Sequence, residues 1–214
     1  MKREHNTIAE IPLPSGYTRL QYIESTGIQY IDTGYYVGNK KTRIIAGFEK
    51  ESPLYQAGVL FACCSPQDDQ AFLNPYYGVG TFNDPRFGIY ALGRANLATI
   101  PSKQNVLVHL DCTIDIPNQT ASIYIEQGSD IIKIIDTYTS TIYNNTLAIF
   151  AQHIGTSYNA KISAILRYFF IHENDVLVHN YIPALRDYDS KPGLYDVIAG
   201  EFKVNNGTGE FQYA

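Results

Sequence analysis

The chain has no tryptophan, only three cysteines among its 214 residues, and no repeating cysteine spacing. Cys63, Cys64 and Cys112 form an odd count, and the adjacent pair lacks the C-x-x-C spacing of a metal or redox site. The count therefore suits a reducing cytosol better than a disulfide-stapled scaffold. We expect these thiols to be buried and chemically inert.

Clusters of basic residues are also missing. Lys and Arg number 16 against 21 Asp and Glu, which gives a formal net charge of -5 and a pI near 5.5. Nucleic acids and anionic membrane surfaces are bound through clustered cations, so neither is expected as a partner. Residues 1–7 lack the apolar h-region of a signal peptide, and no stretch approaches the ~20 apolar residues of a membrane span. We expect no signal peptide and no membrane insertion.

Short segments with strand patterning fill most of the sequence, and no convincing helix is found. A chain of this length can form one all-β domain without a disulfide or metal. We therefore predict an extended arm over residues 1–11 and a single antiparallel β-sandwich over 12–214. The strands expected in the first half, after a pair joined by a tight bend near Gly27, lie at 42–49, 58–64 and 86–92.

The second half predicts hairpins more clearly. They pair 106–114 with 121–126, 161–171 with 176–182 across a turn at 172–175, and 194–198 with 201–204, while 131–139 and 147–154 are single strands. The long hairpin is rich in Ile, Leu, Phe and Val, so we place it in the middle of a sheet. Residues 65–85 form a long connection rich in Asp, Asn, Pro and Tyr, and this is the first candidate for a binding surface.

Both ends of the chain carry a family resemblance. Residues 13–34 (LPSGYTRLQYIESTGIQYIDTG), 181–186 (YIPALR), 193–202 (GLYDVIAGEF) and 207–211 (GTGEF) resemble the start and the closing hairpin of a concanavalin A-like/laminin-G-like jelly-roll domain family of gut bacteria and their phages. The resemblance implies a jelly-roll sandwich whose two ends meet in one sheet. It leaves function open, because this superfamily includes lectins, adhesion modules, hydrolases and structural domains.

No catalytic constellation stands out. A glycan hydrolase needs paired carboxylates that face one cleft, and the nearest pattern is Asp111 with Asp115 on one strand face, without a third acidic partner. We expect these two to be structural or solvated. The five histidines are scattered, and His109 and His179 alternate with apolar residues, which favours hydrogen-bonded imidazoles at the edge of a core. We expect no enzyme activity and no cofactor.

Exposed tyrosines beside Asn, Asp and Arg are the best candidates for a binding site, because sugars combine apolar ring faces with hydroxyl rims. The alternative is that tyrosines, which are common in β-sandwiches, simply cover the rims of the core. The candidate ligand-binding residues, in segments expected to be loops, are Tyr35, Tyr36, Asn74, Tyr76, Tyr77, Asn83, Asp84 and Arg86. Laminin-G-like domains also suggest calcium at the acidic loop Gln67-Asp68-Asp69, but adjacent carboxylates lack the alternating spacing of a calcium loop, so solvation is favoured.

Three functions remain open at this point. The family setting implies a noncatalytic recognition domain of a phage virion (tail, fibre or capsid surface) that binds host cell-surface polysaccharide, with a virion localisation after assembly in the host cytoplasm. The alternative is a purely structural virion component, a capsid decoration, head-fibre or tail protein, held by other virion proteins or by its own copies. The arm over residues 1–11 favours that alternative, since an extended segment can add a strand to a neighbour's sheet. A hydrolase is the third and least supported.

Overall fold

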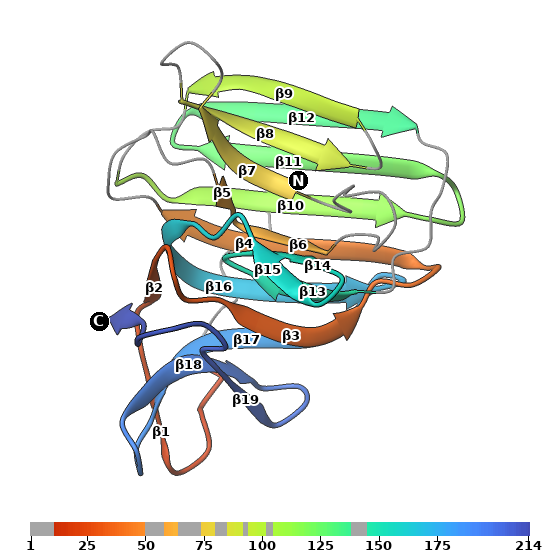
Figure 1. Cartoon of the computed structure of the whole chain (residues 1–214). Helices are drawn as coiled ribbons and strands as arrows, with labels where there is room; N and C mark the ends of the chain where they lie inside the picture. Colours follow the sequence, from red (N-terminus) through yellow and green to blue (C-terminus); the bar gives the residue numbers. More distant parts are fainter. Residues whose placement is uncertain are drawn as a thin grey trace.

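A computed structural model of the chain describes residues 11–49, 58–63, 74–79, 85–91, 94–101, 105–137 and 145–214. All regular structure in these ranges is β-strand (Figure 1). The molecule is an antiparallel β-sandwich of the jelly-roll class, as predicted. The described part of the chain contains no helix long and apolar enough to cross a membrane.

One layer is an 11-stranded sheet. Its main path runs through β12 (Asp130–Thr137), β11 (Thr120–Gln127), β10 (Val108–Asp115), β4 (Lys41–Glu49), β16 (Ser163–Glu173), β17 (Val176–Arg186), β18 (Lys191–Asp196) and β19 (Glu201–Val204). In Figure 1 this path descends from β12 at the top to β19 at the bottom. The long hairpin β16–β17 lies in the middle of the sheet, which confirms the prediction from its apolar composition.

Two smaller sheets complete the sandwich. The first runs through β15 (Ser157–Asn159), β14 (Gln152–Ile154), β6 (Phe61–Cys63), β13 (Thr146–Ile149) and β3 (Ile31–Tyr36); the second through β5 (Gly58–Val59), β7 (Asn74–Val79), β8 (Pro85–Ala91) and β9 (Arg94–Pro101). One pairing, β6 with β14, is parallel, and the other strand pairs of the described residues are antiparallel. In Figure 1, β3 and β13 lie in front of β16 and β17.

The two ends of the chain meet in the large sheet, as the family resemblance implied. Strand β1 (Tyr17–Arg19) pairs with β17, and β2 (Ile23–Thr26) pairs with both β16 and β20 (Gln212–Tyr213). The bend between β2 and β3 contains Gly27 at φ +98°, which is a conformation that favours glycine. The closing hairpin β18–β19 therefore lies close to the first strands of the chain.

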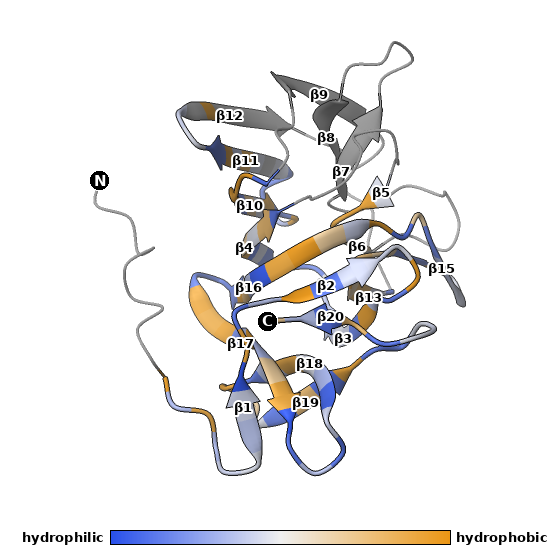
Figure 2. Ribbon diagram, turned by 90° about the vertical axis from the view of Figure 1, so that its left-hand side faces the viewer, coloured by the Kyte–Doolittle hydropathy of each residue, from blue (hydrophilic) through white to orange (hydrophobic). Residues whose placement is uncertain are grey.

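Alternation of apolar and polar residues places the core between the layers. Along β10 every second residue is buried, beginning at Val108. Phe48 of β4 lies 6.2 Å from Phe61 of β6, and Phe61 lies 5.3 Å from Phe169 of β16, measured between ring centroids. These contacts join the two layers, and Figure 2 shows the hydrophobic residues along β16. Cys112 is a buried free thiol whose pKa is raised by desolvation, as expected of an inert cysteine.

Three expectations about strands are wrong. The single strand expected over 58–64 is two strands, β5 and β6, which belong to different sheets. Residues 74–79 lie inside the expected long connection, yet they form β7. Pro75 is tolerated in this strand because β5 pairs only with Tyr76 and Tyr77. Pro75 therefore has a strand neighbour on one side, β8. The single strand expected over 147–154 is two strands, because the backbone of Phe150 adopts φ +64° between β13 and β14. Residues 1–10 and Cys64 lie outside the described part of the chain, so the arm stays a prediction.

Candidate functional site

The structure places the sequence-predicted pair Tyr35 and Tyr36 on opposite faces of one strand. Both lie in strand β3 rather than in a loop. Tyr35 is only 7% exposed, its ring lies 5.5 Å from that of His179, and its hydroxyl is 3.2 Å from Thr42 Oγ1. The prediction of an exposed aromatic platform is therefore wrong for Tyr35, because alternation along β3 turns it toward the other layer. Tyr36 is 56% exposed, and its role in binding stays a prediction.

The other sequence-predicted residues fall in or beside the second small sheet. Asn74, Tyr76 and Tyr77 belong to β7, so the expectation that they lie in a loop is wrong. Arg86 belongs to β8, which matches the strand expected over 86–92. The description of these strands covers their backbone, and their side chains lie outside it. Asn83, Asp84 and the acidic loop Gln67-Asp68-Asp69 fall outside the described residues altogether.

The carboxylates and histidines considered for catalysis have structural contacts. Asp111 accepts two hydrogen bonds from Arg43, at 2.8 Å each, on the face of the large sheet that points away from the core. Asp115 accepts hydrogen bonds from the backbone and side chain of Asn118 in the next turn. His109 hydrogen-bonds the hydroxyl of Tyr168, and His179 Nδ1 lies 2.5 Å from Asp196 Oδ2. These contacts confirm the structural interpretation of all four residues.

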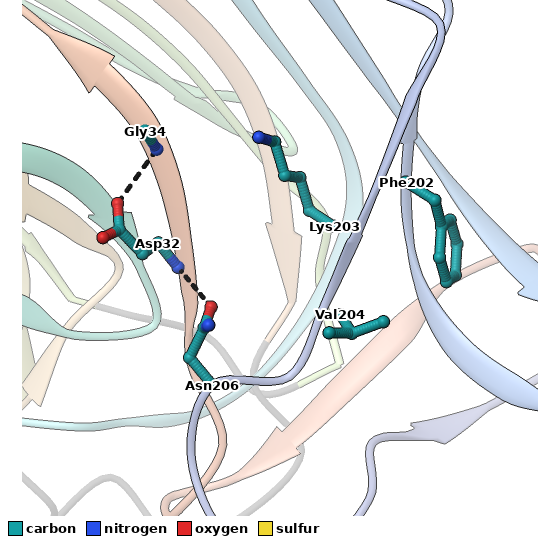
Figure 3. A pocket seen from close by; sticks show the side chains of 6 residues that line it. All are labelled: Asp32, Gly34, Phe202, Lys203, Val204 and Asn206. Carbon is teal, nitrogen blue, oxygen red and sulfur yellow. Dashed lines mark hydrogen bonds between the residues drawn. The ribbon is translucent and has the colours of Figure 1, made fainter.

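A different site emerges at the seam between the two layers. A pocket of about 290 Å³ lies between β3 and β19, each of which is the last strand of its sheet (Figure 3). It is lined by Asp32, Gly34, Phe202, Lys203, Val204 and Asn206. Terminal strands leave backbone N–H and C=O groups without a strand partner on the outer edge. The pocket therefore combines polar side chains with two strand edges.

Side-chain amides hold the two edges together at one end of the pocket. Asn206 Oδ1 accepts a hydrogen bond from the backbone N–H of Asp32 at 2.9 Å, and Asn205 Oδ1 accepts one from Tyr30 N–H at 3.2 Å. The backbone N–H of Asn206 donates to the Tyr30 carbonyl at 2.8 Å. Two asparagines thus replace a partner strand beside β3. Asn206 is exposed, and its Nδ2 donates to no described residue.

Asp32 is the carboxylate among the residues that line the pocket. Its Oδ1 accepts a hydrogen bond from Gly34 N–H at 2.9 Å, and its Oδ2 accepts one from the Tyr158 hydroxyl at 2.7 Å. Partial burial raises the pKa of Asp32, but the hydrogen bonds from Tyr158, Thr146 and Gly34 outweigh this effect and lower the pKa below its ordinary value. Asp32 is therefore an ionised acceptor at neutral pH. Burial and the neighbouring carboxylate raise the pKa of Tyr158, so its hydroxyl keeps its proton.

A stack of aromatic rings holds Tyr158, which donates a hydrogen bond to Asp32, in place. The ring of Tyr158 lies 4.3 Å from that of Tyr30 on one side and 4.2 Å from that of His153 on the other, nearly parallel to both. His153 is held in turn by Thr146, whose Oγ1 lies 2.8 Å from Nδ1. Because both faces of Tyr158 are covered, this ring orients the carboxylate and cannot stack on a ligand.

Lys203 lies over the open floor of the pocket. Its ammonium group is 2.8 Å from Glu201 Oε2, and it would lie 3.8 Å from a Cβ atom placed on Gly34. Gly34 has no side chain to fill the space between Lys203 and Asp32, as Figure 3 shows. The pocket thus offers a carboxylate acceptor, an amide donor and an ammonium donor around the open space at Gly34. The described residues contain no cluster of three His, Cys, Asp or Glu side chains that would suit a metal ion.

Sequence reasoning missed Asp32, Lys203 and Asn206 as site residues. Asp32 and Asn206 are 174 positions apart, so no local motif joins them. The available signal was the Asp32-Thr33-Gly34 triplet, in which a short acidic side chain can bond the backbone two residues on. A second signal was the family resemblance itself, because it covers Asp32, Gly34 and Phe202 in two separate blocks.

Gly34 provides a stability test of the pocket floor. Its φ of +75° strains any other residue, and a β-branched side chain most of all. Gly34→Val is expected to lower the free energy of unfolding by about 1–2 kcal/mol. Urea denaturation measures the change, with Tyr36→Val on the same strand as the control for β-branching. Equal stability of Gly34→Val and wild type would contradict the strain assigned to this position.

Comparisons with known proteins support the fold. No protein-family model and no curated protein matches the sequence. A solved structure of a candidate carbohydrate-binding protein from Bacteroides ovatus is similar, with a TM-score of 0.61 and 12% identity over 92% of this chain. The chain spans 60% of that protein's length, and the similarity shows a shared fold.

Two other solved structures match at lower scores, which add nothing to that conclusion. One is a heptameric SAP-like pentraxin from Limulus polyphemus, with a TM-score of 0.46 and 10% identity over 72% of this chain and 74% of the pentraxin. The other is peanut lectin, with a TM-score of 0.41 and 12% identity over 76% of this chain and 88% of the lectin.

Proposed function

We propose that this protein is a noncatalytic glycan-binding domain and that the seam pocket around Asp32 holds a sugar residue. The observation that carries the proposal is the arrangement of Asp32, Asn206 and Lys203 around the vacant floor at Gly34. Sugar hydroxyls both donate and accept hydrogen bonds, so they need a fixed acceptor beside fixed donors. An ionised carboxylate makes the stronger, charge-assisted kind of hydrogen bond to such hydroxyls.

Other features support the same proposal. The solved structure from Bacteroides ovatus that shares this fold is itself proposed to bind carbohydrate. Tyr36 is an exposed ring on β3, two positions beyond Gly34, so it can contact a ligand that extends past the pocket. Aromatic rings suit the apolar faces of sugars.

The electrostatics of Asp32 favour binding over hydrolysis. Glycoside hydrolysis needs a carboxylic acid that is still protonated near neutral pH, together with a second carboxylate. The lowered pKa of Asp32 makes it unsuited to the role of general acid. The nearby carboxylate of Glu201 forms an ion pair with Lys203.

We place the protein, as a further part of this proposal, on the surface of a phage virion, in a tail, fibre or capsid-surface position. The resemblance of residues 13–34 and 193–202 to domains of gut bacteria and their phages supports this placement. Host cell-surface polysaccharide would then be the natural ligand class.

A structural virion component held by protein contacts is the second candidate. One observation favours it: β12 ends the large sheet, and Ile131 on this strand is 57% exposed. An edge strand with an exposed apolar residue can pair with another chain. A stable oligomer without glycan binding would favour this candidate.

Removing single polar groups from the pocket tests glycan binding. The probe is a printed array of neutral and acidic glycans, followed by calorimetric titration of the strongest binder. Asp32→Asn keeps the shape of the side chain and removes its charge, so we expect affinity to fall about tenfold, the value of one charge-assisted hydrogen bond. Lys203→Gln should weaken binding in the same direction.

The control is Asp175→Asn, which removes an exposed carboxylate in the turn between β16 and β17. It should bind as wild type does. Thermal melts check that Asp32→Asn and Lys203→Gln remain folded. Binding that survives both pocket variants would place the glycan elsewhere, and a wild type that binds nothing on the array would refute the proposed function.

A further inference from the structure

Thr146 on β13 contacts both His153 and Asp32. Its Oγ1 is 2.8 Å from Nδ1 of His153, and its side chain also hydrogen-bonds the carboxylate of Asp32. Thr146 is buried, so its hydroxyl has little contact with solvent. A hydroxyl carries one proton, so Thr146 can donate to His153 or to Asp32, but not to both at once. The protonation state of His153 therefore decides which of the two receives this hydrogen bond.

Both ring nitrogens of His153 face carbonyl oxygens, which only accept hydrogen bonds. Nε2 lies 3.1 Å from the carbonyl oxygen of Gly155, and Nδ1 lies 3.2 Å from that of Thr146. A neutral ring that donates from Nε2 has no proton on Nδ1, so Nδ1 accepts the proton of the Thr146 hydroxyl. A charged ring carries a proton on each nitrogen. Its Nδ1 then donates to Thr146, which leaves the hydroxyl free to donate to Asp32.

Titratable groups on the neighbouring elements set the electrostatics around His153. The ring of Tyr158 on β15 stacks on the imidazole at 4.2 Å, and it is uncharged because the pKa of its hydroxyl is raised. Cys63 of β6 lies in register with His153, and Lys161 is a cation that donates to the Tyr158 carbonyl at 3.0 Å and opposes a charge on the imidazole. Asp32 on β3 attracts that charge, which in turn lowers the pKa of Asp32. A charged His153 therefore stabilises the ionised form of Asp32.

Asp32 also faces two charged groups of β19. Lys203 lines the same pocket, and Glu201 is paired with it at 2.8 Å, so the two together add little net charge. Tyr30 is uncharged, because burial and the Asp32 carboxylate raise the pKa of its hydroxyl. A histidine ordinarily changes charge at a higher pH than a carboxylate does. The hydrogen bond from Thr146 is thus available to Asp32 in mild acid, where the carboxylate begins to take up its own proton.

We propose that His153 and Thr146 are positioning residues that keep Asp32 ionised and fixed in mild acid, so that the pocket retains its glycan there; this inference rests on the glycan binding proposed above. The charged His153 donates to Thr146, and Thr146 donates to Asp32. This chain of hydrogen bonds is called the Asp32 relay below. Hydrogen bonds to the charged form of a carboxylate favour that form, so the relay opposes protonation of Asp32 as the pH falls.

The first measurement follows Asp32 in the protein without glycan. The carboxyl carbon of Asp32 is titrated by NMR from neutral to acid pH, with Asp32→Asn to assign its signal. Thr146→Val keeps the shape of the side chain and removes the hydroxyl, so the Asp32 titration should move to higher pH. His153→Gln cannot gain a charge and should move it in the same direction. The double variant should move it by less than the sum of the two shifts, because His153 acts partly through Thr146.

The second measurement is the affinity for the strongest binder of the glycan array. In mild acid, Thr146→Val should bind about fivefold more weakly than wild type, the value of one ordinary hydrogen bond. Thr146→Ser restores the hydroxyl and should restore both the affinity and the Asp32 titration. The matched control is Thr113→Val, which makes the same replacement on the face of β10 that points away from the core and should change neither readout. Thermal melts check that the variants are folded.

The two measurements separate the relay from glycan binding. An Asp32 titration that is the same in wild type, Thr146→Val and His153→Gln overturns the relay and leaves the pocket proposal intact. Shifts that simply add in the double variant overturn the link between His153 and Thr146. A shifted titration in a protein that binds no glycan on the array supports the relay around Asp32 and overturns the proposed function.

Discussion

Replacement of Asp196 by alanine is expected to lower the free energy of unfolding by about 3–5 kcal/mol, because it removes the acceptor of three hydrogen bonds and an unsatisfied buried donor costs about 1–3 kcal/mol. Asp196 is 0% exposed and accepts three hydrogen bonds. Its Oδ2 lies 2.5 Å from His179 Nδ1, and its Oδ1 accepts from the backbone N–H groups of Asn180 and Ile198 at 3.0 Å each. Alanine would leave two backbone donors and an imidazole without their acceptor.

The conservative variant Asp196→Asn separates charge from hydrogen bonding. An amide oxygen can still accept from the two backbone donors, so this variant should be less destabilised than Asp196→Ala. Urea denaturation at pH 7 measures both losses. Similar stability of Asp196→Ala and wild type would show that neighbouring groups can satisfy these donors.

The same carboxylate gives a defined dependence on pH. Burial raises the pKa of Asp196, but hydrogen bonds from His179, Asn180 and Ile198 outweigh it, so the folded-state pKa lies below the unfolded value. Its contribution to stability is thus complete above about pH 5 and is lost as the pH falls through the folded-state pKa. The stability difference between wild type and Asp196→Asn should shrink below about pH 4. A constant difference would contradict the lowered pKa.

Local sequence patterns were sufficient to predict the hairpins. The turn between β16 and β17 has two residues, Asn174 and Asp175, both with positive φ, and Asn and Asp tolerate this conformation best after glycine. The sequence predicted this hairpin and that of β18 and β19 within a few residues. Strand β7 was missed because Pro75 and Gly78 read locally as loop residues, although a neighbouring strand that ends early makes room for them.

The site could not be predicted in the same way. Its two sides come from β3 near one end of the chain and from β19 and Asn206 near the other, and only tertiary pairing brings them together. Tyrosines in expected loops can be recognised from sequence, whereas the pocket depends on side-chain amides at the edges of strands. Tyr158 illustrates the difference, because its ring serves to position Asp32 rather than to meet a ligand.

Gly207 anchors the segment that holds Asn205 and Asn206 against β3. A Cβ atom at this position would lie 2.2 Å from the carbonyl oxygen of Ile28 and 3.0 Å from Gln29 Cα. Both are backbone atoms, so no change of side-chain rotamer can relieve the overlap. Gly207→Ala is therefore expected to lower the free energy of unfolding by about 3 kcal/mol, at the upper end for overpacking. It should also weaken glycan binding, because Asn206 must move.

Gly16→Ala is the matched comparison for Gly207→Ala. Gly16 has φ +90° and no atom within 4 Å of a Cβ atom placed on it, so its alanine variant reports conformational strain without a steric clash. We expect a loss of about 1 kcal/mol there, with glycan binding unchanged. Thermal melts and titrations of both variants give the comparison. If Gly207→Ala is no less stable than Gly16→Ala, the chain can shift the Asn205–Asn206 segment freely, and the edge contacts of β3 do not hold the pocket in shape.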